Sequence, residues 1–288
     1  MGEFVIHTSD GLRLSAFDWP SNQNPSCPSA VIILIHGLAE YSGRYDHFAQ
    51  FYNENDIAVV SMDLRGHGLS EGKHSFVPTV EAVFSDIDRL IKKTRSRYRK
   101  CPAILYGHSM GGNLALSYTL NRYGKASDKP PYQAIVVTSP YIRLHGHLQL
   151  PRPVNSFVRA VGLVRPSLKI PLRFNSRILS RSANVVDAYN DDPHIRRSIT
   201  LSLARSLGET AKMLDRTACT FHIPVLIQHG DADSLTCHNA SQRFANRGKN
   251  TEFKSWPFCY HELHHEPERD EIFHFTLDWI REKTNLSH

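Results

Sequence analysis

Short hydrophobic runs recur along the chain without polar alternation, as is typical of strands that are covered on both faces of a parallel sheet. Five such runs are rich in Val, Ile and Leu and span residues 31–36, 58–63, 103–108, 134–139 and 224–230. Residues 251–258 predict a further strand. Near the N-terminus, residues 3–8 and 12–19 alternate polar and apolar positions around Ser9-Asp10-Gly11, which predicts a hairpin.

Hydrophobic residues between these runs follow helical spacing. Residues 80–91 and 272–280 are the clearest examples, since their apolar positions recur three or four residues apart. Strands that alternate with helices in this way indicate an α/β fold with a mostly parallel central sheet flanked by helices.

The stretch from Tyr141 to about Arg205 interrupts this alternation. It has no clear strand pattern and carries prolines at positions 151, 153, 166 and 171. We expect it to be an insertion that forms a cap, or lid, over the carboxyl edge of the sheet. The chain then divides into a core of residues 1–140, a cap of residues 141–205 and a second core segment of residues 206–288.

Composition limits the location that we expect. The 288 residues are 41% hydrophobic, enough for one sizeable core. The five cysteines are scattered and odd in number, which favours free thiols in a reducing compartment. The start, MGEFVIHTSDG, has no signal-peptide pattern, and the apolar runs are too short to span a bilayer. These features predict a cytoplasmic protein.

The segment YGHSMGG at residues 106–112 carries the strongest chemical signal. Gly107-His108-Ser109-Met110-Gly111 fits the G-x-S-x-G pattern, between an apolar strand and the helical LALSYTL. A sharp strand-to-helix turn of this kind exposes a serine hydroxyl as a nucleophile. The alternative is a glycine-rich turn whose serine has no role. The context favours Ser109 as the nucleophile.

A serine nucleophile needs a base and an orienting carboxylate, which follow it along the chain in the order acid, then histidine. Asp231 and Asp233 follow the strand at 224–230, and His261 follows the next strand. We predict Asp233 as the acid, with Asp231 as the alternative. Either aspartate could instead cap a loop as an Asx turn.

The segment YHELHHE at residues 260–266 also fits H-E-x-x-H, a zinc-protease signature that must lie on a continuous helix. Pro257 and Pro267 flank it closely, so we predict a loop. We therefore assign His261 as the general base, expect no metal, and keep His264 or His265 as the competing bases.

An oxyanion hole needs two backbone N–H groups near the nucleophile. Met110 supplies the group directly after Ser109, and the loop that follows residues 31–36 supplies the second through Leu38. Gly37 would let this backbone approach closely, unless it is an ordinary glycine at a strand end.

In these blocks the chain resembles the monoacylglycerol lipase branch of the α/β-hydrolase family. The similar segments lie in order over nearly the whole chain: HGLAEYSGRY (36–45), DLRGHGLSEG (63–72), GHSMGG (107–112), SPYIRL (139–144), VVDAYNDDP (185–193), GDADSL (230–235) and YHELHHE (260–266). The resemblance implies hydrolysis of the ester between one fatty acyl chain and glycerol, without a metal or cofactor. It also implies a triad of Ser109, Asp233 and His261, with Leu38 and Met110 as oxyanion donors.

The resemblance further suggests that Glu40, Arg44 and His264 lie in or near the polar pocket for the glycerol end. Glu40 and Arg44 could instead simply pair with each other. The cap sequence diverges most from the family, so acyl-chain and head-group preference stay open.

Most of the positive charge lies in the cap. The net charge is +6, and residues 141–186 contain no acid but eight basic residues, namely Arg143, Arg152, Arg159, Arg165, Lys169, Arg173, Arg177 and Arg181. Val154, Phe157, Val158 and Val161 would share one helical face, with Arg159 opposite. This face either docks on an anionic membrane, giving peripheral attachment, or covers the acyl tunnel while the arginines are solvated.

Three functions compete at this stage. The first is a serine hydrolase of monoacylglycerol. The second keeps the chemistry but acts on lysophospholipid or on carboxylesters generally. The third is a non-catalytic lipid-binding protein, which has no need of a complete triad. Nucleic-acid binding is not expected, because the charge comes without any recognition module.

Overall fold

The computed structural model describes residues 1–125, 127–149, 151–172, 174–217 and 220–286, without the side chains of residues 152, 155, 157 and 159. Its central sheet has eight strands in the order β1-β2-β4-β3-β5-β6-β9-β10. The strands are β1 (Gly2–His7), β2 (Arg13–Trp19), β3 (Ala30–Ile35), β4 (Ile57–Met62), β5 (Ala103–His108), β6 (Ala134–Thr138), β9 (Thr220–Gly230) and β10 (Lys249–Trp256).

Most neighbouring strands of the sheet are parallel, as predicted. Only the N-terminal hairpin runs the other way, since β1 pairs antiparallel with β2 and β2 pairs antiparallel with β4. All residues of β3, β4, β5 and β6 are buried, in agreement with their unbroken hydrophobic runs. Gly11 has φ +87° in the predicted hairpin turn, a conformation that favours glycine.

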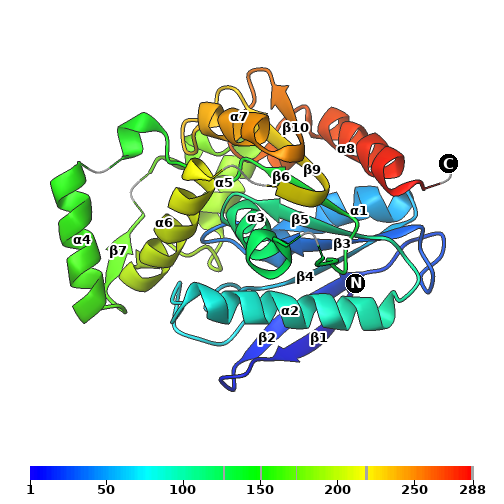
Figure 1. Cartoon of the computed structure of the whole chain (residues 1–288), viewed down its shortest axis with the longest axis horizontal. Coiled ribbons are helices and arrows are strands. Elements are labelled where there is room, and N and C mark those ends of the chain that lie inside the picture. Colours follow the sequence, from blue (N-terminus) through cyan, green and yellow to red (C-terminus); the bar gives the residue numbers. More distant parts are fainter. Residues whose placement is uncertain (126, 150, 173, 218–219, 287–288) are drawn as a thin grey trace.

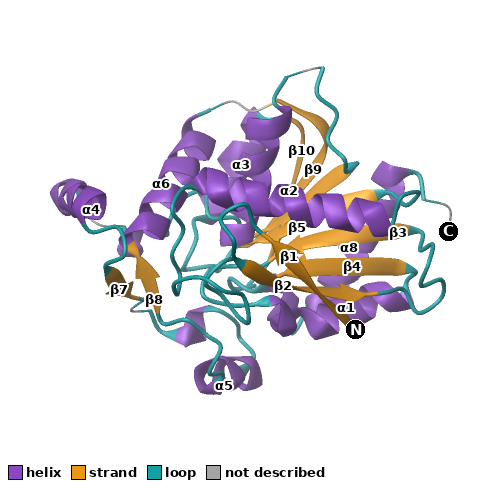
Figure 2. Ribbon diagram, turned by 90° about the horizontal axis from the view of Figure 1, so that it is seen from below, coloured by secondary structure: helices purple, strands orange, loops and turns teal. Residues whose placement is uncertain are grey.

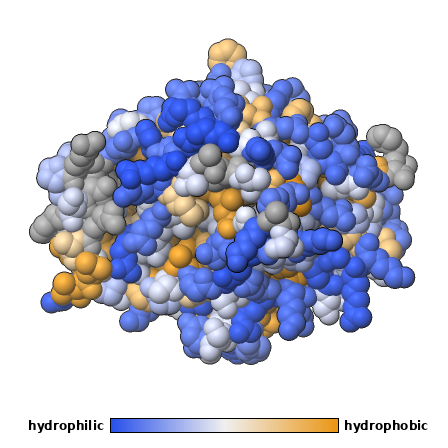
Figure 3. Space-filling model, viewed as in Figure 1, coloured by the Kyte–Doolittle hydropathy of each residue, from blue (hydrophilic) through white to orange (hydrophobic). Residues whose placement is uncertain are grey.

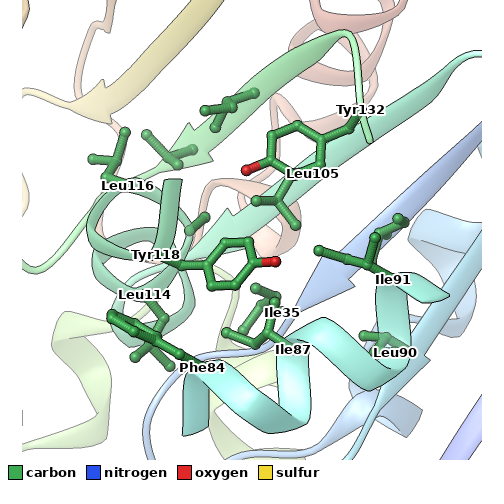
Figure 4. Packing of buried hydrophobic residues seen from close by; sticks show 14 of the residues in the cluster. Ile35, Phe84, Ile87, Leu90, Ile91, Leu105, Leu114, Leu116, Tyr118 and Tyr132 are labelled. Carbon is green, nitrogen blue, oxygen red and sulfur yellow. The ribbon is translucent and has the colours of Figure 1, made fainter. Parts of the chain in front are cut away.

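Helices cover both faces of the sheet (Figures 1 and 2). On one face lie α1 (Asp46–Glu54) and α8 (Arg269–Thr284), whose aromatic and aliphatic residues pack on Ile32, Leu34 and Ile104. On the other face lie α2 (Val80–Arg97), α3 (Met110–Tyr123), α6 (Leu201–Arg216) and α7 (His238–Arg247). In Figure 4, Ile87 and Phe84 of α2 point toward Tyr118 and Leu114 of α3 over Leu105 of the sheet.

The region predicted as the cap contains α4 (Arg152–Val164), β7 (Lys169–Pro171), α5 (Ala183–Asp191) and β8 (Ser198–Thr200). Although the sequence shows no clear strand pattern in this region, β7 and β8 form a short antiparallel pair. Each strand has only three residues, and one of them ends in Pro171. Neither is therefore long enough to show a strand pattern of hydrophobic residues in the sequence. The predicted boundary at residue 205 falls inside α6.

Four short 3-10 helices complete the described elements: η1 (Ser42–Tyr45), η2 (Gly146–Leu148), η3 (Ser176–Ile178) and η4 (Leu263–His265). Among the described residues, no helix combines the length and the hydrophobicity that crossing a bilayer requires.

Candidate active site

Ser109 lies in the sharp turn between β5 and α3, with φ 52° and ψ −111°. Positive φ is strained for a residue with a side chain, and it turns the serine out of the strand direction. Two flanking glycines are required for the turn. A Cβ on Gly107 would lie 2.3 Å from the carbonyl oxygen of Gly111, and a Cβ on Gly111 would lie 2.0 Å from that of Ile35.

The structure brings the three predicted triad residues together at the carboxyl edge of the sheet. Nε2 of His261 lies 2.9 Å from Oγ of Ser109. Nδ1 of the same ring lies 2.7 Å from Oδ2 of Asp233. All three residues are buried, with Ser109 the most accessible at 8% exposure. This is the geometry in which a histidine can take the serine proton while a carboxylate orients its ring.

Backbone and side-chain donors hold the Asp233 carboxylate in place. Oδ1 accepts hydrogen bonds from the amides of Leu235 and Thr236 at 2.7 and 3.0 Å. Oδ2 accepts from the Thr236 hydroxyl at 2.7 Å and lies 3.0 Å from Nε2 of His229. The alternative acid, Asp231, is exposed and accepts from the Phe258 amide instead.

Charge pairing tunes the buried dyad of Asp233 and His261. Burial acts to raise the pKa of Asp233, but the charge of His261 and hydrogen bonds from His229 and His261 hold it well below its usual range. Burial acts to lower the pKa of His261, but the Asp233 carboxylate outweighs it and raises that pKa. An ionised acid and a histidine of increased basicity are what general-base catalysis requires.

The H-E-x-x-H segment is not a continuous helix, in agreement with the predicted loop. Only Leu263–His265 form a single 3-10 turn. The competing base His264 is fully buried and stacks on Tyr45, and Nδ1 of His265 lies 2.8 Å from the Glu262 carboxylate. Among the described contacts, neither ring reaches Ser109.

Two side-chain groups are compact enough to offer three metal ligands each. Glu262, His264 and His265 place ligand atoms within 4.8 Å of one another, as do Cys259, Glu266 and Glu268. In each group an arginine already binds carboxylate. Arg44 pairs with Glu262 at 2.7 Å, and Arg181 pairs with Glu266 at 2.6 Å and also with Glu268. The adjacent guanidinium charge works against a cation in both places.

A cavity of about 250 Å³ opens above Ser109, and Leu38 and Met110 both line it. Met110 is also the first residue of α3, whose first N–H groups have no partner within the helix. The predicted oxyanion donors therefore lie beside the nucleophile. The cap supplies most of the opposite wall through Leu172, Phe174, Leu179, Tyr189 and Ile199.

Two carboxylate side chains line the cavity. Glu40 lines it, together with Glu262, which the sequence did not single out. Behind them, Arg44 binds Glu40 at 2.6 Å and binds both Glu262 oxygens at 2.8 and 2.7 Å. The side chains of Glu40, Arg44 and Glu262 are all less than 10% exposed.

Of the three residues predicted for the glycerol end, only Glu40 lines the cavity. Arg44 and His264 lie behind the cavity wall. These two residues do not face the substrate directly. Arg44 is bound by two carboxylates, and His264 packs against Tyr45 and His108.

Hydrogen bonds tie the cap to the loops that carry the triad and the predicted oxyanion donor. The Glu262 amide donates to the Leu179 carbonyl at 2.8 Å, and the Ser180 hydroxyl donates to the His265 carbonyl at 2.8 Å. The Arg196 amide donates to the carbonyl of Ala39 at 2.9 Å. Ala39 itself has φ 68° in the loop after β3.

Two of the basic cap residues form ion pairs, and three others are exposed. Arg143 pairs with Asp215, and Arg181 pairs with Glu266 and Glu268. Arg165, Lys169 and Arg177 are exposed. The side chains of Arg152, Phe157 and Arg159 and the whole of Arg173 lie outside the described part of the chain. The predicted apolar face of α4 is thus described only at Val154, Val158 and Val161.

Comparison with known proteins identifies relatives over most of the chain. A family described as serine aminopeptidase, S33, matches residues 26–268. A monoacylglycerol lipase of Mycolicibacterium smegmatis is 28% identical over 94% of this chain and 93% of its own length. An uncharacterized abhydrolase domain-containing protein of Dictyostelium discoideum is 34% identical over 96% of this chain, which spans only 28% of that protein.

A solved structure has the same fold. A soluble variant of monoglyceride lipase from Saccharomyces cerevisiae superposes with a TM-score of 0.83 at 19% identity, over 97% of this chain and 94% of that one. The predicted α/β-hydrolase fold and the predicted resemblance are confirmed. Because the family match covers most of its length, the chain belongs to the serine aminopeptidase S33 family of α/β-hydrolases.

Proposed function

We propose that the protein is a serine hydrolase that cleaves monoacylglycerol to glycerol and a free fatty acid. The observation that carries the proposal is the hydrogen-bonded chain of Ser109, His261 and Asp233 beside a largely apolar cavity, which Ser109 and His261 line together with the carboxylates of Glu40 and Glu262. The relatives named as monoacylglycerol or monoglyceride lipases support the substrate.

The proposed mechanism has two steps. His261 takes the proton from Ser109 as the hydroxyl oxygen attacks the ester carbonyl, and the amides of Leu38 and Met110 stabilise the oxyanion. The C–O bond to glycerol then breaks, and glycerol leaves with the proton from His261. Water next attacks the acyl-enzyme, with His261 again as base, and releases the fatty acid and Ser109.

The lining of the cavity suits the two parts of this substrate. Leu172, Phe174 and Leu179 offer apolar surface to the acyl chain. Glu40 and Glu262 can accept hydrogen bonds from the glycerol hydroxyls. One arginine between these two carboxylates leaves a net negative charge, which opposes an anionic phosphate group bound beside them. This favours monoacylglycerol over lysophospholipid.

The test compares release of oleate from monooleoylglycerol and from lysophosphatidylcholine at equal concentration, with Ser109→Ala as the control. We expect faster turnover of the glycerol ester and none in the variant, which should unfold at the same temperature as the wild type. Faster lysophospholipid turnover would overturn the substrate. Turnover by Ser109→Ala would overturn the nucleophile.

A fluorophosphonate label separates an enzyme from a lipid-binding protein on the same scaffold. We expect it to modify Ser109 in the wild type and nothing in Ser109→Ala. The proposed chemistry uses neither metal nor cofactor, because the triad supplies nucleophile, base and orienting acid. Turnover should therefore persist after treatment with EDTA.

We also propose that the protein is cytoplasmic and attaches peripherally to anionic membranes through its cap. Leu163, Val164 and Leu168 are 70%, 76% and 51% exposed near the end of α4. Figure 3 shows a hydrophobic patch at the lower left, where α4 ends in Figure 1. The exposed Arg165 and Lys169 adjoin these residues in the chain, so apolar surface and positive charge coincide.

A further inference from the structure

A second cavity of about 490 Å³ lies beside the active-site cavity, and we call it the α6 groove. Ile142, Leu144, Val158, Ile170, Leu201 and Ala204 give it an apolar wall. Tyr141, Leu144 and Ala204 line both cavities, so a single layer of side chains separates the groove from the site above Ser109.

The polar wall of the α6 groove is mostly basic. Arg143, Arg205, Lys212 and Arg216 line it, against Glu209 and Asp215. Arg143 and Asp215 neutralise each other as an ion pair. Three cations then face the single carboxylate of Glu209, which leaves an excess of positive charge beside an apolar surface.

Arg205 is the unusual member of this wall. Its Nε is buried and has no hydrogen-bond partner, and the side chain makes no ion pair among the described residues. The guanidinium of Arg143 has Asp215 as its partner on the same wall. A buried donor without a partner is costly, and the cost is recovered when an acceptor binds.

We propose that the α6 groove is a binding site for a long-chain carboxylate, whose head Arg205 binds and whose tail lies along the apolar wall. An arginine fork and a carboxylate match in geometry and charge. The carboxylate of Glu209 on the same wall disfavours a doubly charged phosphate head. A fatty acid is the class of molecule that the proposed hydrolysis releases next door, so this source of the ligand rests on the proposed function.

The test measures binding of a fluorescent long-chain fatty acid to the full-length Ser109→Ala protein, which keeps the groove and should turn nothing over. We expect Arg205→Gln to weaken binding about tenfold or more, as expected for the loss of a charged hydrogen-bonding partner, and Arg205→Lys to weaken it less. Arg243→Gln is the matched control, because Arg243 is exposed on α7 and does not line the groove. It should leave binding unchanged.

A second measurement separates the groove from the active-site cavity. Wild-type protein with Ser109 blocked by a long-chain phosphonate should still bind one equivalent of fatty acid, and the corresponding methyl ester should bind far more weakly. The proposal would be overturned if Arg205→Gln left fatty-acid binding unchanged, or if binding disappeared when Ser109 is blocked. If Ser109 did not react with the phosphonate, the proposed function would fail. The comparison of Arg205 variants would still decide whether the groove binds a fatty acid. Thermal unfolding confirms that each variant is folded.

Discussion

The Asp233 carboxylate combines complete burial with several donors directed at its two oxygens. Burial acts to raise its pKa, but the charge of His261 and the hydrogen bonds from His229 and His261 hold that pKa low, so the carboxylate stays charged. Its charge in turn favours the protonated form of His261. The basicity of His261 therefore depends on a residue that does not contact the proposed substrate.

Replacing Asp233 with Asn tests this dependence. The amide keeps the size of the side chain but removes the charge, so burial should dominate and the pKa of His261 should fall. His261 must be neutral to act as a base, so the acid limb of the pH–rate profile should move to lower pH. We expect kcat to fall about 10³- to 10⁴-fold. An unshifted acid limb would mean that Asp233 does not set the basicity of His261.

Arg44 holds two carboxylates together below the cavity, and Arg44→Met should leave both without their cation. Removing one partner of a buried ion pair costs about 3–5 kcal/mol, which urea unfolding near pH 7 would measure. Burial opposes ionisation, while Arg44 lowers the pKa of Glu40 and of Glu262. Without Arg44, the pKa values of both glutamates rise. The loss of unfolding free energy should therefore become smaller as the pH falls and the two acids are protonated.

The exposed pair of Arg13 and Glu71 provides the control for this experiment. Their side chains are 67% and 42% exposed, so Arg13→Met should cost only about 0–1 kcal/mol. Equal losses in the two variants would show that burial does not strengthen the Arg44 network.

Some residues of the site could be predicted from the sequence and others could not. Ser109 could be identified from the sequence because its strand, turn and helix follow one another directly in the chain. Glu262 was missed because its partner Arg44 is 218 positions away, and nothing local shows that this acid is buried. Asp231 and Asp233 could not be separated from spacing, since only the fold decides which carboxylate faces His261.

At the scale of elements, the close approach of α3 to β3 depends on Gly111, whose Cα lies against the backbone of Ile35. Gly111→Ala should destabilise the protein by about 1–3 kcal/mol in urea unfolding, because the added methyl group meets a carbonyl that cannot move alone. Gly208→Ala in α6 is the control. A Cβ there meets nothing within 4 Å, so this change should stabilise by about 0.5–1 kcal/mol.

The long buried strands were predictable because covering on both faces demands unbroken hydrophobic runs, as in β3 to β6. The pair of β7 and β8 was not, because each strand has only three residues and, of these six, only Thr200 is buried. The α6 helix crosses the predicted edge of the cap because one part of it packs on the core and another lines both cavities.

At the scale of the whole molecule, membrane attachment through the cap predicts a dependence on lipid charge. The protein should co-sediment with vesicles that contain anionic lipid and stay in solution with neutral ones, and high salt should release it. Leu163→Ser together with Val164→Ser should weaken this binding, since both side chains are largely exposed. Binding that does not respond to salt would count against the charged cap as the contact.

The hydrogen bonds that join Leu179 and Ser180 of the cap to the loop of His261 have a consequence for protein engineering. This part of the cap and the loop at residues 261–268 hold one another in place, so they form one module despite lying far apart in the gene. A chimaera that receives a foreign cap should lose activity even when the new cap folds. A second chimaera, in which residues 179–181 and 261–268 come from the same donor protein, should regain activity.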